Sequence, residues 1–220
     1  MSAFGDHDGP RVYGLPPGAN FTAELAAGIK ARLAGQPPEA LARVEVAINT
    51  SRASRALEEA FENAAEAVFL PRITTFERFV DDPLTDAPPA IDGLERRLTL
   101  TRLIDRMLTL DPSLGPPGAA GPLADTLARL LDEMHGSKAP LSSLDGAVDD
   151  AALAKHWETS LKFLKVLGDG WPAHLAEKGA VDPEARYALA TAAKITALQS
   201  APPSHMVLAA GSTGSKRVTS

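Results

Sequence analysis

The sequence contains no cysteine, so disulfides, thiolate zinc sites and iron–sulfur ligation are excluded within these 220 residues. No apolar run approaches the roughly 18–20 residues that a membrane-spanning helix needs. The first residues have neither the basic start nor the apolar stretch of a secretion signal. The net charge is −6, and no segment forms a basic tail. We therefore expect a cytoplasmic chain without membrane contact, in which nucleic acid could bind through a local patch but not through the overall charge.

Four short runs of apolar and β-branched residues are typical of strands. They cover residues 11–15, 44–48, 68–73 and 206–210. Helical periodicity separates the first three runs, with one helix beginning after Asn20 and the next at Thr50 or Ser51. Strands that alternate with helices at these lengths predict βαβ units and a parallel sheet, and hence an α/β fold.

The middle of the chain changes character after a Pro/Asp loop at residues 82–89. Strand signals vanish there, and apolar residues recur at helical spacing. Helices are predicted from Asp92, over 123–136, over 151–167 and from Asp182-Pro183. We therefore expect an all-helical domain over 83–202, inserted into an α/β domain made of 1–82 and 203–220. A parallel strand normally continues into a helix that covers the sheet, but the fourth strand run lies close to residue 220. This sequence is therefore interpreted as an N-terminal piece of a longer protein.

The turn after the first predicted strand occupies the position of a phosphate-binding loop. Such a loop needs G-x-x-x-x-G-K-[ST], because its Lys neutralises phosphate charge and its Ser or Thr holds Mg²⁺. Here Gly14 and Gly18 are present, but the Lys is missing. Pro16 and Pro17 also remove backbone N–H donors. A plain structural turn is the better interpretation of this stretch.

Hydroxyl and arginine side chains lie near the ends of the second and third predicted strands or directly after them. The candidates for contact with phosphate groups are Thr50, Arg52, Arg55, Arg72, Thr74 and Thr75. Such residues at the start of a helix that follows a parallel strand are suited to binding phosphates. A solvated helix face with a capping Thr is the alternative explanation of the same residues.

At these positions the sequence resembles a known family. A strand followed by T-x-R-x-x-R, and a strand followed by T-x-F, are similar to the first two DNA-contact motifs of superfamily 1 helicases. Six stretches in order, within residues 11–215, resemble the N-terminal region of AddB, the B subunit of the AddAB helicase–nucleases that process double-strand DNA breaks. They are LPPG at 15–18, PEALARVE at 38–45, FLPRI at 69–73, LDEM at 131–134, HWETSLKFL at 156–164 and AGSTGS at 210–215.

The resemblance implies a helicase-like fold that no longer works as a motor and that pairs with an active AddA-type helicase subunit. The missing phosphate-loop Lys agrees with this. In parts of the family, the fold reads a recombination-hotspot sequence on the passing strand. Family members also have a C-terminal nuclease domain, often with an iron–sulfur cluster, and nothing in this sequence supplies either. The resemblance therefore implies DNA as a partner, with no catalytic residue and no cofactor in this chain.

Two other classes of function stay open from the sequence. The turn formed by Gly211, Ser212, Thr213, Gly214 and Ser215 can bind an anion through its amides, which would make the chain a nucleotide-binding enzyme. The turn lacks G-K-[ST], and no Asp or Glu occurs there to hold Mg²⁺. The third class is an architectural domain that docks the partner subunit and does not touch DNA.

The remaining polar residues have no pattern of a metal or catalytic site. Four histidines, His135, His156, His174 and His205, lack the spacing of metal ligands. Several arginines lie along one predicted helix, namely Arg96, Arg97, Arg102 and Arg106. They either face DNA or pair within the helix with Glu95 and Asp105.

Overall fold

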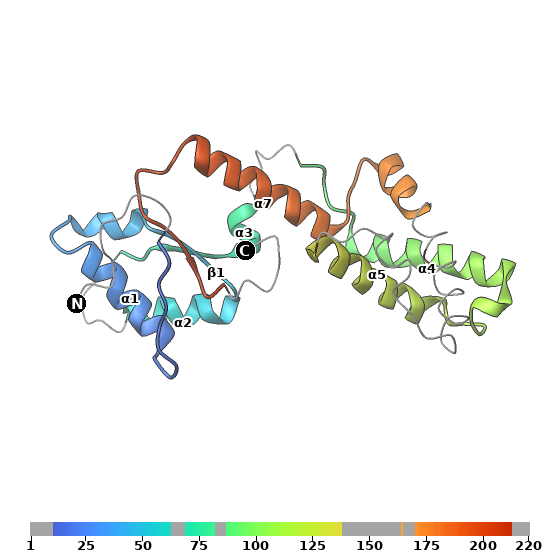
Figure 1. Ribbon diagram of the computed structural model, residues 1–220, viewed down its shortest axis with the longest axis horizontal. Coiled ribbons are helices and arrows are strands. Elements are labelled where there is room, and N and C mark those ends of the chain that lie inside the picture. The colour runs from blue at the N-terminus through green and yellow to red at the C-terminus, as the bar shows by residue number, and fades with distance from the viewer. Residues whose placement is uncertain (1–10, 63–68, 82–86, 138–163, 165–169, 213–220) are drawn as a thin grey trace. The chain divides into compact units, whose positions relative to one another are not determined.

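The structure of the chain is a computed structural model that describes residues 11–62, 69–81, 87–137, 164 and 170–212. It is a mixed α/β structure in which most elements are helices (Figure 1). By its internal contacts the chain divides into two compact units. Unit 1 comprises Met1–Asp82 and Thr196–Thr213, and unit 2 comprises Pro83–Ile195 and Gly214–Ser220.

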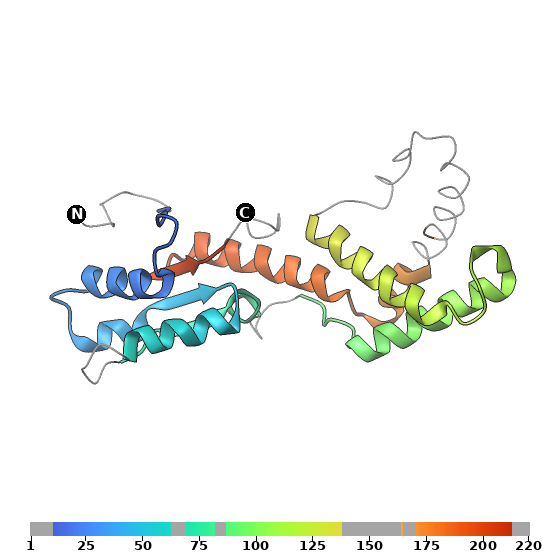
Figure 2. The same ribbon diagram turned by 90° about the horizontal axis from the view of Figure 1, so that it is seen from below.

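A parallel sheet of three strands forms the centre of unit 1. The strands are β1 (Glu45–Ile48), β2 (Arg72–Thr75) and β3 (Val207–Ala210). Their spatial order is β2-β1-β3, and both pairings are parallel. Figure 2 shows the arrows of β1 and β3 running in the same direction. The predicted parallel sheet is therefore confirmed, with β1 as its central strand.

One face of the sheet contains the core of unit 1. Side chains alternate between the two faces of a strand, so Val46 and Ile48 of β1 share a face. Both are fully buried, and they pack with α1 (Phe21–Arg32) and α2 (Ser51–Glu62). The residues that these helices bury most deeply are Ile29, Leu57 and Phe61. Their burial follows from the four-residue spacing of apolar side chains on each helix.

Both helices of this core begin at the residues that the sequence indicates. The Asn20 side chain accepts a hydrogen bond from the Ala23 amide at 3.2 Å, and the Thr50 hydroxyl accepts one from the Ala53 amide at 3.1 Å. Each side chain thereby satisfies an N–H group that the first helical turn leaves without a backbone partner. The two predicted helix starts are confirmed.

The first predicted strand, over residues 11–15, is wrong. The segment is irregular, and Val12 is 96% exposed. Strand-forming residues become a strand when they pair and pack against neighbours, and this segment pairs with none of β1, β2 and β3. A tight turn follows, in which the Ala19 amide donates to the Pro16 carbonyl at 3.2 Å. Gly18 adopts φ +86° in this turn, a conformation that suits glycine.

The third predicted strand begins later than its apolar run suggests. Pro71 has no N–H and cannot donate to a ladder of strand hydrogen bonds. The first ladder bond runs instead from the Arg72 amide to the Val44 carbonyl, at 2.8 Å. The strand then continues through two β-branched threonines to Thr75, and α3 (Phe76–Val80) follows directly.

Unit 2 is helical in its described residues, apart from a single parallel bridge between Ala90 and Val181. Asp92 caps α4 (Gly93–Leu110), as predicted, by accepting from the amides of Leu94 and Glu95. The apolar face of α4 packs against α5 (Ala120–Ser137). The core formed there includes Leu100, Ile104, Leu108, Leu127, Trp171 and Leu175. The predicted amphipathic pattern of both helices is therefore confirmed.

The end of unit 2 is described in part. The predicted helix over 151–167 lies outside the described residues, apart from Leu164. Residues 170–178 are helical, and α7 (Pro183–Ser200) begins after Asp182 as expected. No helix of the described residues combines the length and the apolar character that crossing a bilayer requires.

Candidate nucleic-acid interface

The three strands of unit 1 end together at one edge of the sheet. The register pairs Ile48 of β1 with Thr75 of β2 and with Ala210 of β3. We call this end of the sheet the carboxyl edge, and the opposite end, where Glu45 pairs with Arg72, the amino edge. Neighbouring strands lie about 4.8 Å apart, so the residues that follow β1 and β2 start from adjacent points.

Two hydroxyl groups lie at the carboxyl edge. Thr50 caps α2 through its contact with the Ala53 amide, and Thr75 caps α3 by accepting from the Arg78 amide at 3.5 Å. A hydroxyl has one donor hydrogen as well as its acceptor lone pairs, and capping uses an acceptor. Each hydroxyl therefore keeps its hydrogen, which it can donate to a phosphate oxygen.

Two predicted arginines lie beside these hydroxyls on α2. Arg52 and Arg55 belong to its first turns, where the backbone amides and the helix dipole favour negative charge. They are three residues apart and therefore share one side of the helix. Both are exposed, and neither guanidinium has an ion pair or a hydrogen bond within the described part of the chain. Each is available to a phosphate without breaking an existing contact.

The predicted arginine on β2 does not join this group. Arg72 is the first residue of the strand, at the amino edge, and its Nη1 lies 3.0 Å from Glu45 Oε1. His205 Nε2 lies 3.5 Å from the same carboxylate oxygen. Arg72 is 73% exposed, but its charge is already matched. The structure therefore separates Arg72 from Thr50, Arg52, Arg55 and Thr75.

Thr74 lies one residue before the end of β2. It is opposite Ala47 in the register, and its side chain points to the other face of the sheet from Thr75. From the sequence alone, Thr74 and Thr75 are equivalent candidates for contact with phosphate groups. The structure places Thr75 at the edge, as a cap, and Thr74 on a sheet face.

The loops after β1 and β3 touch each other. Gly211 follows β3 at φ +69°, and a Cβ atom added to it would lie 3.3 Å from Asn49 Oδ1. In the strand order β2-β1-β3, the chain runs from β1 to β2 on one side of β1, and β3 lies on its other side. The position between β1 and β3 is therefore a topological switch point. In open α/β sheets, ligands bind outside the carboxyl ends of the strands at such points.

The predicted anion turn falls across the limit of the described residues. Gly211 and Ser212 lie at the carboxyl edge, whereas Thr213, Gly214 and Ser215 lie outside the described residues. The predicted phosphate-loop position, with Gly14 and Gly18, lies in the irregular segment before α1, and no strand precedes it among the described residues. Its strand–turn–helix context is therefore missing.

No protein-family model, curated protein or solved structure matches this chain. The function of the carboxyl edge is therefore inferred from the groups that it presents. These are hydroxyl donors and guanidinium cations that no described residue pairs with, and such groups suit an anionic ligand. No cluster of His, Asp and Glu that could hold a metal ion occurs among the described residues.

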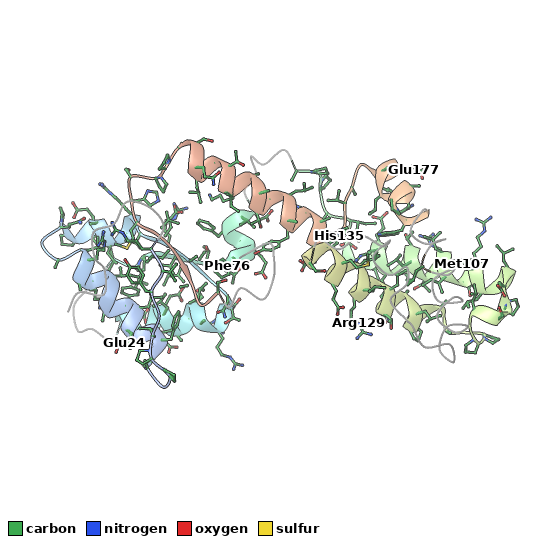
Figure 3. All side chains as sticks on the ribbon, viewed as in Figure 1. Glu24, Phe76, Met107, Arg129, His135 and Glu177 are labelled. Carbon is green, nitrogen blue, oxygen red and sulfur yellow. The ribbon has the colours of Figure 1, made fainter. Side chains whose placement is uncertain are left out.

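Unit 2 has a polar cluster around a buried carboxylate that the sequence does not reveal. We call it the Asp182 cluster, and it consists of Asp182, Arg96, Trp171, His135 and Asp132. Asp182 is 2% exposed; it accepts from Trp171 Nε1 at 2.9 Å and lies 2.8 Å from Arg96 Nε. Arg96 also reaches Asp132 at 2.9 Å, and His135 Nε2 lies 3.4 Å from Asp182. Figure 3 shows His135 at the end of α5.

These contacts set the charge state of Asp182. Burial raises its pKa, whereas the hydrogen bonds from His135 and Trp171 and the charge of Arg96 lower it. The balance holds the pKa of Asp182 below its ordinary value, so the carboxylate is ionised at neutral pH. The cluster joins α4, α5, the helix over 170–178 and the start of α7.

Two of the arginines of α4 pair with carboxylates of other elements. Arg96 is buried in the Asp182 cluster, and Arg97 forms a bidentate pair with Asp125 of α5, at 2.8 and 3.0 Å. Glu95 pairs with Lys178 rather than with an arginine of its own helix. Pairing within the helix is therefore wrong for Arg96 and Arg97, because neighbouring helices bring carboxylates closer. Arg102 donates to Leu98 O and Thr99 Oγ1, and Arg106 is exposed.

Proposed function

We propose that this chain is the noncatalytic, helicase-like region of an AddB-type subunit, in which the carboxyl edge guides a DNA strand by contacts with its phosphates. In this proposal unit 2 is the helical insertion of the helicase-like domain. The chain would act beside an AddA-type motor in a helicase–nuclease that processes double-strand breaks.

The observation that carries the proposal is the pairing of Ile48 with Thr75. It brings the ends of β1 and β2 together, and with them two capping hydroxyls and the guanidiniums of Arg52 and Arg55, which have no partner among the described residues. Guanidinium groups bind phosphates with two parallel hydrogen bonds, and hydroxyls add neutral donors. The sequence order of the elements agrees, because Pro83–Ile195 of unit 2 lie between β2 and β3 in the chain.

Contacts of this kind predict binding that depends on salt and not on base sequence. Each phosphate neutralised by a cation releases condensed counterions, so affinity falls as salt rises. Hydroxyl and guanidinium contacts to the backbone position a strand but do not read it. The chain as a whole is acidic, at −6, so attraction must come from the local group of cations.

The test is DNA binding by the full chain, measured with a fluorescein-labelled oligo(dT) over a series of salt concentrations. The Arg52→Ala/Arg55→Ala variant should bind more weakly and show a salt slope smaller by about one to two. Arg43→Ala is the matched control, because Arg43 is an exposed arginine that ends the 3-10 helix before β1, near the amino edge.

Two results would overturn the proposal. If the unmodified chain does not bind the oligonucleotide at low salt, the architectural function is favoured instead. If the chain binds ATP saturably while the double variant keeps its full DNA affinity, the nucleotide-binding alternative replaces the proposal.

A further inference from the structure

A third arginine lies at the carboxyl edge, on the element that follows β2. Arg78 belongs to α3, three residues after Thr75, and its backbone N–H donates to the Thr75 hydroxyl at 3.5 Å. Its side chain is exposed, and its guanidinium has no ion pair or hydrogen bond among the residues that the structure describes. It therefore resembles Arg52 and Arg55 in every property that matters for binding a phosphate.

Arg72 differs from Arg78 in both position and charge environment. Three residue steps along β2 separate Arg72 from Thr75, which corresponds to about 10 Å. Its guanidinium already contacts the half-buried Glu45 carboxylate at 3.0 Å. A phosphate at Arg72 would therefore meet a cation whose charge Glu45 already offsets, whereas a phosphate at Arg78 would meet a cation that no described residue pairs with.

We infer that Arg78, and not Arg72, is the phosphate-binding arginine on the β2 side of the carboxyl edge. This inference rests on the proposed function and specifies its ligand contacts. Arg52 and Arg55 then bind phosphate from the helix that follows β1, and Arg78 binds phosphate from the helix that follows β2. The ligand is the sugar–phosphate backbone of a nucleic-acid strand, because its successive phosphates offer a separate anionic group to the cations that follow each strand.

The test compares Arg78→Ala with Arg72→Ala in the full chain. Binding of fluorescein-labelled oligo(dT) is followed by fluorescence anisotropy at several salt concentrations. Arg78→Ala should weaken binding several-fold and reduce the salt slope by about one, whereas Arg72→Ala should leave both unchanged. An Arg78→Lys variant keeps the charge without the planar fork, and it should recover the salt slope but not the full affinity.

The outcomes separate this inference from the proposed function. If Arg52→Ala/Arg55→Ala weakens binding while Arg78→Ala does not, the carboxyl edge binds DNA but Arg78 has no part in it. If Arg72→Ala weakens binding as much as Arg78→Ala does, the assignment between the two arginines is overturned. If the unmodified chain does not bind, both proposals fail. Circular dichroism should show unchanged helix content in both variants, since both side chains are exposed.

Discussion

Arg96 and Asp182 form a buried ion pair, with 2.8 Å between Arg96 Nε and Asp182 Oδ1. Their side chains are 8% and 2% exposed. The pair connects α4 with the residue that precedes α7. Beside this pair, the Ile91 amide donates to the Val181 carbonyl at 2.9 Å, and the Val181 amide donates to the Pro89 carbonyl at 3.0 Å. The segments that lead into α4 and into α7 are therefore held together by charge and by backbone bonds.

Breaking this pair should destabilise unit 2. Asp182→Asn leaves the buried Arg96 charge with Asp132 as its one carboxylate among the described residues. Removing one partner of a buried ion pair costs about 3 kcal/mol, and more where no second partner remains. Urea unfolding followed by circular dichroism measures the loss.

Asp125→Asn is the matched control for this change. It removes an ion pair of similar length, with Arg97, that is exposed to solvent. Exposed pairs contribute about 1 kcal/mol or less. If the two variants lose equal stability, the buried cluster does not have the structural importance that its contacts indicate.

The Asp182 cluster also predicts how stability depends on pH. The pKa of Asp182 is lower in the folded chain than its ordinary value of 3.8. A group with a depressed folded pKa contributes stability that is fully present above its unfolded pKa and is lost as the pH falls through the folded one. Stability should therefore fall in acid below about pH 4, and Asp182→Asn should make that fall shallower. An unchanged pH profile in this variant would contradict the assignment.

Thr50 should contribute to stability apart from any contact with DNA. Its hydroxyl caps α2 at the Ala53 amide, so Thr50→Ala should cost about 1 kcal/mol. Thr50→Ser keeps the hydroxyl and should retain most of that stability. Thermal unfolding of the two variants measures the difference, and equal losses would show that the cap is not what stabilises this helix.

The contact between the loops after β1 and β3 predicts a cost at Gly211. Gly211→Ala introduces a Cβ atom at φ +69° and 3.3 Å from Asn49 Oδ1, so we expect a loss of about 1–2 kcal/mol. Gly14→Ala is the control, because nothing lies within 4 Å of the added atom there. Unfolding midpoints in urea compare the two changes, and a Gly211→Ala variant as stable as the control would mean that the loops are not held against each other.

Much of the fold follows from local patterns in the sequence. Phe61 is fully buried where the four-residue spacing on α2 places it, and Asn20 and Asp92 cap the helices that they precede. The run at 11–15 has a comparable strand signal but pairs with none of β1, β2 and β3. Local propensity cannot distinguish this run from β1, because pairing in a sheet depends on residues far away in the sequence.

The candidate site could be predicted in part for the same reason. Thr50 and Arg52 follow a strand that the sequence locates well, and the structure keeps them together. In the sequence, the apolar run that ends at residue 73 places Arg72 near the end of its predicted strand, in the same group as Thr74 and Thr75. The strand begins at Arg72 instead, which moves this side chain to the amino edge and brings Arg78 to the carboxyl edge. The Asp182 cluster joins residues that are distant in sequence, so no local sequence pattern predicts it.

Site-specific crosslinking tests the central claim, that the carboxyl edge contacts DNA, most directly. A photo-crosslinking amino acid is placed at Ser51, at Glu77 or at Arg43 of the full chain, all of them exposed. The first two follow the ends of β1 and β2, and the third precedes the amino edge. The account predicts crosslinks to labelled oligo(dT) from positions 51 and 77 and not from 43. Equal crosslinking from all three positions, or from 43 alone, would contradict it.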